Sequence, residues 1–556
     1  MKHFFYAAVM ALCFNSCSFG QGNRPRVSGV NSEMMAALQK VYVAMNAVNS
    51  LYVDTVNTAQ LSENIVRDML ERLDPHSSYL TAEEVKAADE PLQGNFDGIG
   101  IQFNMLTDTL YVIQVISGGP SEKVGLLAGD KIMKVNDTLI AGVKMNQNKV
   151  VSMLKGPKGT KVNVKVLRKN VSKLIDFEIT RDKIPVTSLD AAYMLDKETG
   201  YIKLKQISAI THEEMMTALE SLKKQGMNNL ILDLQGNGGG YLKAAIDISN
   251  EFLQSGQLIV YTEGVHQPRE NAIARYKGKY ADCKLIVLVN EASASASEII
   301  AGAVQDWDRG LIVGRRSFGK GLVQRPVELP DGSMIRLTTG HYYTPSGRSV
   351  QKPYTMGDTE TYHRELIDRY NRGEMLSADS IHFPDSLKFS TLVNKRTVYG
   401  GGGIMPDYFV SMDTTGILGE VSKSQFYPEI QSLIYKFSNQ LVDNHRSEYN
   451  KKYPDFDALN KNYFITDKML EDLLDIYKKE QTENAENKTF KLTEEQLADW
   501  GKIKPFVALQ VKMLVIRDLL TEADATRFSN IYFNEPLKAA LQIINDDARY
   551  DKLLGN

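Results

Sequence analysis

The chain has 556 residues, of which 43% are hydrophobic and 24% are charged, so it is long and apolar enough for several globular domains. Its 65 Lys and Arg residues nearly balance 68 Asp and Glu residues, and no long block of like charge occurs. This balance excludes an extended patch for nucleic acid or for an anionic membrane. No Cys and His residues have metal-site spacing, so we expect neither a metal nor a cofactor.

The first 20 residues have the pattern of an export signal. A basic start precedes an apolar run from Phe4 to Phe14, which is too short to span a bilayer, and small residues follow. Ser18 to Gly20 fits a signal-peptidase site, whereas Phe14 replaces the Leu expected before a lipidated Cys17. We therefore expect an exported, periplasmic protein. A soluble form is favoured over a lipid-anchored lipoprotein, and membrane contact is expected only if Cys17 is lipidated.

Two helices are predicted after the signal, within residues 31–82. Leu38, Val41, Tyr42 and Met45 mark one face of the first helix, and the second covers Leu61 to Leu73. The stretch LDPHSSYL, Leu73 to Leu80, closes this segment.

The next segment, residues 83–182, begins with the glycine-rich stretch FDGIGIQF, Phe96 to Phe103. A second strand, a short helix from Pro120 to Gly125, a Gly-Asp turn and another strand follow. This order resembles a PDZ domain. The resemblance implies that Gly98, Ile99, Gly100 and Ile101 form a loop whose N–H groups bind the terminal carboxylate of a peptide. A small structural β-domain, used only as a hinge or lid, is the alternative.

Strands and helices alternate from residue 183 to 412. Thr211 and Glu214 have the spacing of a capping box that opens a helix, and apolar strands start at Leu230, Leu258, Leu285 and Leu311. This rhythm predicts a parallel or mixed sheet. Pro330 to Ser333 predicts a hairpin turn, and the polar insertion 352–402 is either a surface lid or a tolerated loop.

The stretch from Asn290 to Gln324, NEASASASEIIAGAVQDWDRGLIVGRRSFGKGLVQ, carries the chemistry. A serine-rich turn lies between a buried strand and a helix, so a hydroxyl is exposed where the free N–H groups of the first helical turn can bind an oxyanion. Lys320 follows in a loop between glycines. A lysine serves as a base when burial or nearby positive charge lowers its pKa.

This stretch resembles the active-site signature of the carboxy-terminal processing peptidases, serine peptidases with a Ser-Lys dyad. The resemblance implies that Ser295 is the nucleophile, Lys320 its base and Gln324 the residue that orients the lysine. It also implies an oxyanion hole formed by the N–H groups of Gly239 and Ala296.

Three further residues are interpreted from the resemblance. Ser293 and Ser297 are expected to be turn and helix-cap residues, and His76 is not expected to act in catalysis. Gln235 departs from the family, in which arginine is common at this place, and this puts in doubt any ion pair that the arginine would make.

The remaining residues, 413–556, are predicted to be helical. Ile430, Leu433, Ile434, Phe437 and Leu441 form one stripe, Thr493 with Gln496 opens a further helix, and Phe506 to Leu520 forms another. This extension is expected to serve self-association, adaptor contact or stabilisation of the core.

The sequence thus predicts a multidomain α/β protein: a mixed α/β peptidase core with an inserted PDZ domain, an N-terminal helical segment and a C-terminal helical extension. The predicted function is that of an exported serine endopeptidase that binds unfolded or flexible protein C-termini and cleaves through an acyl-enzyme. A non-catalytic PDZ scaffold or adaptor is the alternative from another class, and an acyl-transfer enzyme acting on small molecules is a third.

Overall fold

The computed structural model describes residues 32–106, 108–484 and 490–555, and the predicted export signal with Cys17 lies outside them. The chain divides into two compact units, one that ends at Asp68 and one from Met69 to Asn556. The first consists of α1 (Ser32–Leu51) and most of α2 (Thr58–Glu71). Both helices were predicted, but the apolar stripe of α1 is exposed, with Tyr42 69% accessible. None of the described helices is long and apolar enough to cross a membrane.

The second unit contains an antiparallel sheet in the predicted PDZ segment. Its strand order is β3 (Ile101–Leu106), β4 (Thr109–Val115), β5 (Lys131–Val135), β7 (Lys161–Leu167) and β8 (Ile175–Thr180), with β6 (Thr138–Leu139) beside β5. Alternate residues of β7 are buried, as expected of a strand with one covered face. The helices are α4 (Pro120–Lys123) and α5 (Gln147–Leu154). Strands β2 (Asn95–Gly98) and β9 (Asp182–Pro185) pair where the chain enters and leaves this domain.

A six-stranded sheet forms the centre of the peptidase core. Its order is β10 (Leu189–Met194), β11 (Thr199–Leu204), β12 (Asn229–Asp233), β15 (Lys284–Val289), β16 (Leu311–Gly314) and β21 (Tyr408–Phe409). All neighbours pair in parallel except β10 with β11. Since the carboxyl ends of parallel strands share one edge of a sheet, the loops after β12 and β15 are adjacent.

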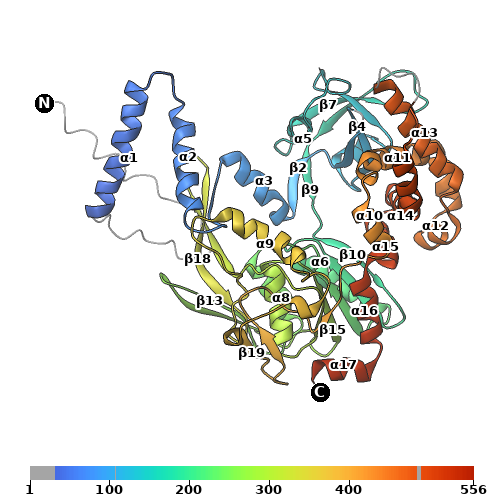
Figure 1. Ribbon diagram of the computed structural model, residues 1–556. Helices are drawn as coiled ribbons and strands as arrows, with labels where there is room; N and C mark the ends of the chain where they lie inside the picture. The colour runs from blue at the N-terminus through green and yellow to red at the C-terminus, as the bar shows by residue number, and fades with distance from the viewer. Residues whose placement is uncertain (1–31, 107, 485–489, 556) are drawn as a thin grey trace. The chain divides into compact units, whose positions relative to one another are not determined.

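Helices cover both faces of this sheet (Figure 1). On one face lie α6 (Thr211–Lys224), α7 (Leu242–Asn250) and α8 (Ala296–Asp306), packed against a cluster that includes Leu230 and Val287. On the other lie α16 (Glu535–Ile544) and α17 (Asp547–Leu554), packed against a cluster that includes Ile231 and Ile286. The last two helices therefore stabilise the core, which is one of the roles expected of the extension.

A second, antiparallel sheet lies beside the first. Its order is β1 (Ser78–Leu80), β18 (Met334–Tyr343), β13 (Leu258–Gly264) and β14 (Gln267–Ile273), and β17 (Leu322–Glu328) pairs with β18. The predicted turn at Pro330 to Ser333 joins β17 and β18, and Leu329 N donates to Ser333 O at 2.9 Å. The strand at Leu258 was expected to share the rhythm of the central sheet. It instead pairs antiparallel with β14 and β18, because an apolar run does not specify its partners.

The other elements form the connections, the insertion and the extension. They are α3 (Ala82–Gln93), α9 (Thr359–Asn371), η1 (Ala378–Ser380), η2 (Asp385–Leu387), β19 (Lys388–Ser390) and β20 (Thr397–Tyr399), then α10 (Ile417–Lys423), α11 (Tyr427–Lys452), α12 (Phe456–Asn462), α13 (Asp467–Asn484), α14 (Glu494–Leu519) and α15 (Glu522–Phe533).

Two local predictions about helix starts had different outcomes. The capping box of Thr493 and Gln496 is confirmed, but the helix that it opens runs on through Pro505, so the two helices expected there are one. The capping box at Thr211 was wrong, although α6 begins at Thr211. Thr211 Oγ1 accepts from Ser208 N at 2.7 Å instead, and Glu214 accepts from Ser188.

Candidate active site

Two loops meet at the carboxyl edge of the central sheet. Gly239, after β12, has φ +101°, and a β carbon placed on it would lie 2.9 Å from both Ala296 N and Ser295 Cβ. Only glycine suits this close approach and this left-handed conformation. The carbonyl of Asn237 joins the loops by accepting from Ala294 N and from Ser297 Oγ, each at 3.0 Å.

Ser295 occupies the N-cap position of α8 with φ 55° and ψ −114°, a conformation that costs energy for any residue except glycine. The hydroxyls of its two serine neighbours are bonded to the main chain. Ser293 Oγ donates to Leu234 O at 2.7 Å, and Ser297 is bonded as described above. Ser297 is therefore structural, as expected, but the helix cap is Ser295.

A cavity of about 970 Å³ is lined by all five residues predicted for catalysis and the oxyanion hole. Its lining includes Gly239, Ser295, Ala296, Lys320 and Gln324. The PDZ loop residues Gly98, Ile99, Gly100 and Ile101 do not line it. Among the described residues no hydrogen bond joins Ser295 Oγ to Lys320 Nζ. The N–H of Gly239 already donates to Asn237 Oδ1 at 2.9 Å.

Lys320 is held by the residue predicted to orient it. Lys320 Nζ donates to Gln324 Oε1 at 3.1 Å, and Gln324 Nε2 donates to the carbonyl oxygen of His76. Burial lowers the pKa of Lys320, and the positive charge of Arg336 lowers it further, whereas Glu298 raises it. The net decrease favours the neutral amine that a base requires.

His76 lies beside the site without the properties of a base. Burial lowers the pKa of its imidazole to about 4, and the positive charge of Lys320 adds to this effect. Its Nε2 is 2.8 Å from the hydroxyl of Tyr362. The carbonyl of His76, rather than its ring, contacts the predicted catalytic residues.

Glu298 ties the serine turn to the lysine loop. Its Oε2 accepts from Ser295 N at 2.8 Å and from Lys320 N at 2.9 Å. Its Oε1 accepts from Gly319 N at 2.7 Å and from Ser317 Oγ at 2.5 Å. The side chain is fully buried, and burial raises its pKa to about 7 against the effect of these hydrogen bonds. Sequence reasoning missed Glu298, although its spacing from Ser295 is that of a capping box.

Tyr342 makes a second link between the same two segments. Its buried hydroxyl lies 3.1 Å from Ser295 O and 2.6 Å from Lys320 O. Glu298 and Tyr342 thus bind the N–H groups and the carbonyl groups of Ser295 and Lys320. The spacing of the two residues is fixed by buried groups.

The insertion also holds the lysine loop. Arg369 of α9 is 1% exposed and donates to Arg316 O at 2.7 Å and to Ser317 O at 2.9 Å. Tyr362 of α9 packs edge-on against the ring of Phe318. The first helix of the insertion is therefore in contact with the segment that carries Lys320.

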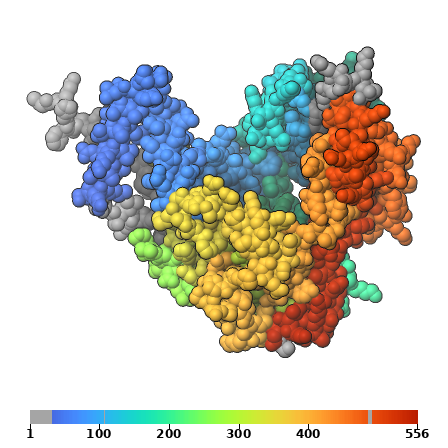
Figure 2. Space-filling model, in the orientation of Figure 1, coloured from blue at the N-terminus to red at the C-terminus, as the bar shows by residue number. Residues whose placement is uncertain are grey.

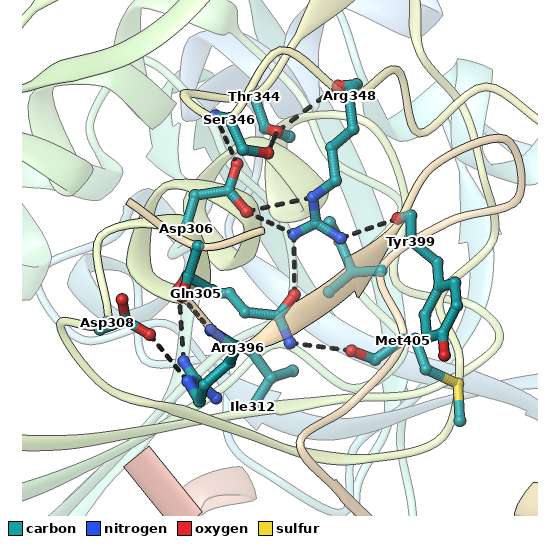
Figure 3. Close-up of polar contacts among 12 residues, drawn as sticks. Gln305, Asp306, Asp308, Ile312, Thr344, Ser346, Arg348, Arg396, Tyr399 and Met405 are labelled. Carbon is teal, nitrogen blue, oxygen red and sulfur yellow. Dashed lines mark hydrogen bonds and ion pairs between the residues drawn. The ribbon is translucent and has the colours of Figure 1, made fainter. Parts of the chain in front are cut away.

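A buried polar network anchors the other end of α8 (Figure 3). Arg348 donates to Asp306 Oδ1 at 2.7 Å, to Gln305 Oε1 at 2.8 Å and to Tyr399 O at 2.8 Å. Asp306 and Arg348 are both fully buried, so the loss of one partner would leave an unpaired charge in the core.

Gln235, singled out from the sequence, and Cys283, the free cysteine of the described residues, both have structural surroundings. Gln235 donates through Nε2 to Asn534 Oδ1 at 3.1 Å, so it contacts the helical extension. Burial raises the pKa of the Cys283 thiol to about 11, which suits a core residue rather than a nucleophile. In the described part of the chain no group of three or more His, Cys, Asp or Glu side chains is placed to hold a metal ion.

Comparison with known proteins identifies two of the domains. Residues 98–179 match the PDZ domain, and residues 198–361 match peptidase family S41. The carboxy-terminal-processing protease of Bartonella bacilliformis is 38% identical over 312 residues, which are 55% of this chain and 70% of that protein. The carboxy-terminal processing protease CtpA of Bacillus subtilis is 33% identical over 355 residues, 63% of this chain and 75% of that protein.

This chain belongs to the carboxy-terminal processing proteases. It is a serine-type protease with a mixed α/β core, a PDZ domain and a helical C-terminal region. A solved structure of the photosystem II D1 C-terminal processing protease is 28% identical, with a TM-score of 0.33, over 58% of this chain and 91% of that chain. Residues 430–521 match a family of unknown function, and the peptidase match ends at residue 361.

Proposed function

We propose that the protease hydrolyses peptide bonds through an acyl-enzyme on Ser295, with Lys320 as the general base. The observation that carries this proposal is the placement of Lys320: its amine is buried, bound by Gln324 and in one cavity with Ser295 at the N-terminus of α8.

Each step follows from the chemistry of these groups. The neutral amine of Lys320 takes the proton of Ser295 Oγ as the oxygen attacks the scissile carbonyl carbon. The resulting ammonium returns the proton to the leaving amine, which departs and leaves an ester on Ser295. Water then attacks the ester carbon as Lys320 accepts a proton from it. The bond to Ser295 Oγ breaks, the ammonium returns the proton to that oxygen, and the new carboxyl terminus leaves. Small movements within the cavity would bring Lys320 Nζ into hydrogen-bonding distance of Ser295 Oγ.

The oxyanion would be bound by the N–H of Ala296, in the first turn of α8, and by the N–H of Gly239. Gly239 can take this part only if its bond to Asn237 Oδ1 opens. The rigid link through Glu298 and Tyr342 would hold the serine and the lysine while this loop adjusts.

The PDZ domain would select the substrate. We propose that the loop Gly98–Ile101 binds the terminal carboxylate of a flexible protein tail, which adds as a strand to the free edge of β3. Gly100 has φ +75°, and a β carbon on it would lie 3.1 Å from Ile184 Cδ1 and 3.3 Å from Pro120 Cδ, so the loop is tightly packed. The pattern of residues 1–20 supports export of the protease to the periplasm.

A cleavage assay on a soluble protein with a free apolar C-terminus tests the proposal. The parent enzyme should cut it, and Ser295→Ala should lower kcat by on the order of a thousandfold or more. Ser293→Ala and Ser297→Ala are the matched controls and should retain far more activity. Equal activity of Ser295→Ala and the parent would refute the assignment, and no cleavage by the parent would favour the scaffold alternative.

A further inference from the structure

The edge of the PDZ sheet has a defined direction for a bound tail. Among the described residues β3 pairs with β4 and has no strand on its outer edge, and α5 packs with β3 around one apolar cluster. A carboxylate bound at Gly98–Ile101 lies at the start of β3. The tail must therefore approach from the other end of the strand, near Met105. Since a strand rises roughly 3.3 Å per residue, Met105 is roughly 13 Å beyond Ile101.

A helix of the C-terminal extension lies beside the far end of β3. A cavity of about 370 Å³ is bordered by Asn104 and Met105 of β3, by Gln147 of α5, and by Gln431, Ser432 and Tyr435 of α11. The cavity touches both β3 and α5, which are the two elements beside which a tail added to β3 would lie. Figure 2 shows the orange C-terminal helices in contact with the blue-green PDZ domain.

Polar contacts hold α11 against the PDZ domain. Lys169 Nζ donates to Asp443 O at 3.0 Å and to Asn444 Oδ1 at 2.8 Å. A β carbon on Gly129 would lie 3.2 Å from Asp443 Oδ1, so the two segments of the chain approach closely there. The opposite face of α11 packs into the core of the extension through Ile430, Leu433, Ile434 and Phe437. Gln431 and Tyr435 are one helical turn apart and share the face toward the cavity.

We propose that α11 forms a subsite for the substrate residue about four positions before the C-terminal residue. This inference rests on the proposed binding of protein tails by the PDZ domain, and it gives the extension a part in choosing substrates. The subsite selects uncharged side chains. Its walls are a thioether, a phenol ring, amides and one hydroxyl, with no Lys, Arg, Asp or Glu among them. An apolar side chain can pack against the thioether and the phenol ring, whereas a charged one finds no residue of opposite charge in this lining.

The expected size of the effect is that of burying one medium-sized apolar side chain, reduced by the cost of ordering the longer tail. We therefore expect an eight-residue tail to bind about tenfold more tightly than its last four residues alone, since about 1.4 kcal/mol corresponds to tenfold.

Peptide binding to the full-length Ser295→Ala protein provides the test. Fluorescent peptides of four and eight residues, with the same apolar free C-terminus and with Leu or Lys at the fifth residue from the end, are titrated by fluorescence anisotropy. The Leu octapeptide should bind about tenfold more tightly than the tetrapeptide, and Lys should remove most of this gain. Adding Ser432→Trp, which fills the cavity from an exposed position, should bring the octapeptide to within about twofold of the tetrapeptide.

The matched control is Ser447→Trp, which places the same side chain at an exposed position four turns further along α11. It should leave both peptides unaffected, and Ser432→Trp should leave tetrapeptide binding unchanged, which also shows that the domain is folded. Equal affinity of the two peptides for the Ser295→Ala protein would overturn the subsite while leaving PDZ recognition intact. So would tighter binding of the octapeptide by Ser432→Trp. Failure of both peptides to bind would contradict the PDZ proposal itself, and the subsite with it.

Discussion

Replacement of Glu298 by glutamine perturbs the link between the serine turn and the lysine loop by one functional group. Each carboxylate oxygen of Glu298 accepts two hydrogen bonds. In the variant, the amide nitrogen fits best at the Oε1 position, because the Ser317 hydroxyl can rotate to accept from it. The remaining oxygen then keeps the N–H groups of Ser295 and Lys320, whereas Gly319 N and the buried O–H of Ser317 lose their acceptor.

The cost follows from these two donors. A buried donor without a partner costs about 1–3 kcal/mol, so Glu298→Gln should destabilise the core by at least this amount and retain measurable activity. Glu298→Ala leaves four donors without the carboxylate and should cost several kcal/mol. That is a large part of the 5–15 kcal/mol that is typical of a whole domain, so this variant should lose activity through disorder of both segments.

The effect of Glu298→Gln also depends on pH. Burial raises the pKa of Glu298 from 4.5 to about 7, so between these values the folded state binds more protons than the unfolded state. The stability of the parent therefore falls as the pH rises through this window, by about 3 kcal/mol in total. Glutamine does not titrate. Its deficit relative to the parent should shrink by about 2–3 kcal/mol between pH 5 and pH 8.

Urea unfolding at the two pH values measures this difference. Trp307, at the C-cap of α8, reports on the core when Trp500 of the extension is replaced by phenylalanine in both proteins. Glu480→Gln is a control at a half-buried carboxylate of the extension, paired with Lys436. An equal deficit of Glu298→Gln at pH 5 and pH 8 would refute the reasoning, because Glu298 would then keep one charge state throughout.

Three other predictions concern the lysine, the insertion and the PDZ loop. Lys320→Arg should be as inactive as Lys320→Ala, since arginine stays charged, and rescue by arginine would show that only positive charge is needed. The kcat of the parent should rise with pH through a pKa below the ordinary lysine value of 10.5. Arg369→Met should lower the free energy of unfolding by about 1–3 kcal/mol for each carbonyl left without a donor, and it should also lower kcat. Arg364→Met, on the exposed side of α9, should change neither quantity. Equal behaviour of the two variants in urea unfolding and cleavage assays would show that the insertion does not support the lysine loop. Gly100→Trp and amidation of the substrate C-terminus should each raise KM for a long substrate with a smaller change in kcat, because both remove contacts of the terminal carboxylate. Equal cleavage of free-acid and amidated substrates would show that the PDZ domain has only a structural role.

The strand, turn and helix around Ser295 were predictable because each is encoded locally. The apolar run Leu285–Val289, the small residues after it and the helix that ends near Asp306 need no distant partner for their recognition. Lys320 and Gln324 were singled out by the family resemblance; the amine of Lys320 donates to Gln324 Oε1, and the orienting role stays a prediction.

Contacts between distant segments were not predictable in the same way. Glu298 could have been noticed by its spacing from Ser295, but its bonds to Gly319 and Lys320 exist only once the loop after β16 folds back. The burial of Arg369 was not predictable, because a charged residue in a polar insertion is usually exposed to solvent. Its guanidinium donates to carbonyls 52 and 53 positions away in the sequence. The partners of the strand at Leu258 were predicted wrongly for the same reason, since an apolar pattern alone does not determine which strand lies beside it.

The nucleophile is tested most directly by covalent trapping. The parent protease is incubated with a fluorophosphonate, which forms a stable adduct with an activated serine, and the modified peptide is located by mass spectrometry. We predict one adduct, on Ser295, that forms much more slowly in Lys320→Arg and is absent in Ser295→Ala. An adduct on Ser293 or Ser297, or labelling at an unchanged rate in Lys320→Arg, would contradict the Ser295–Lys320 assignment.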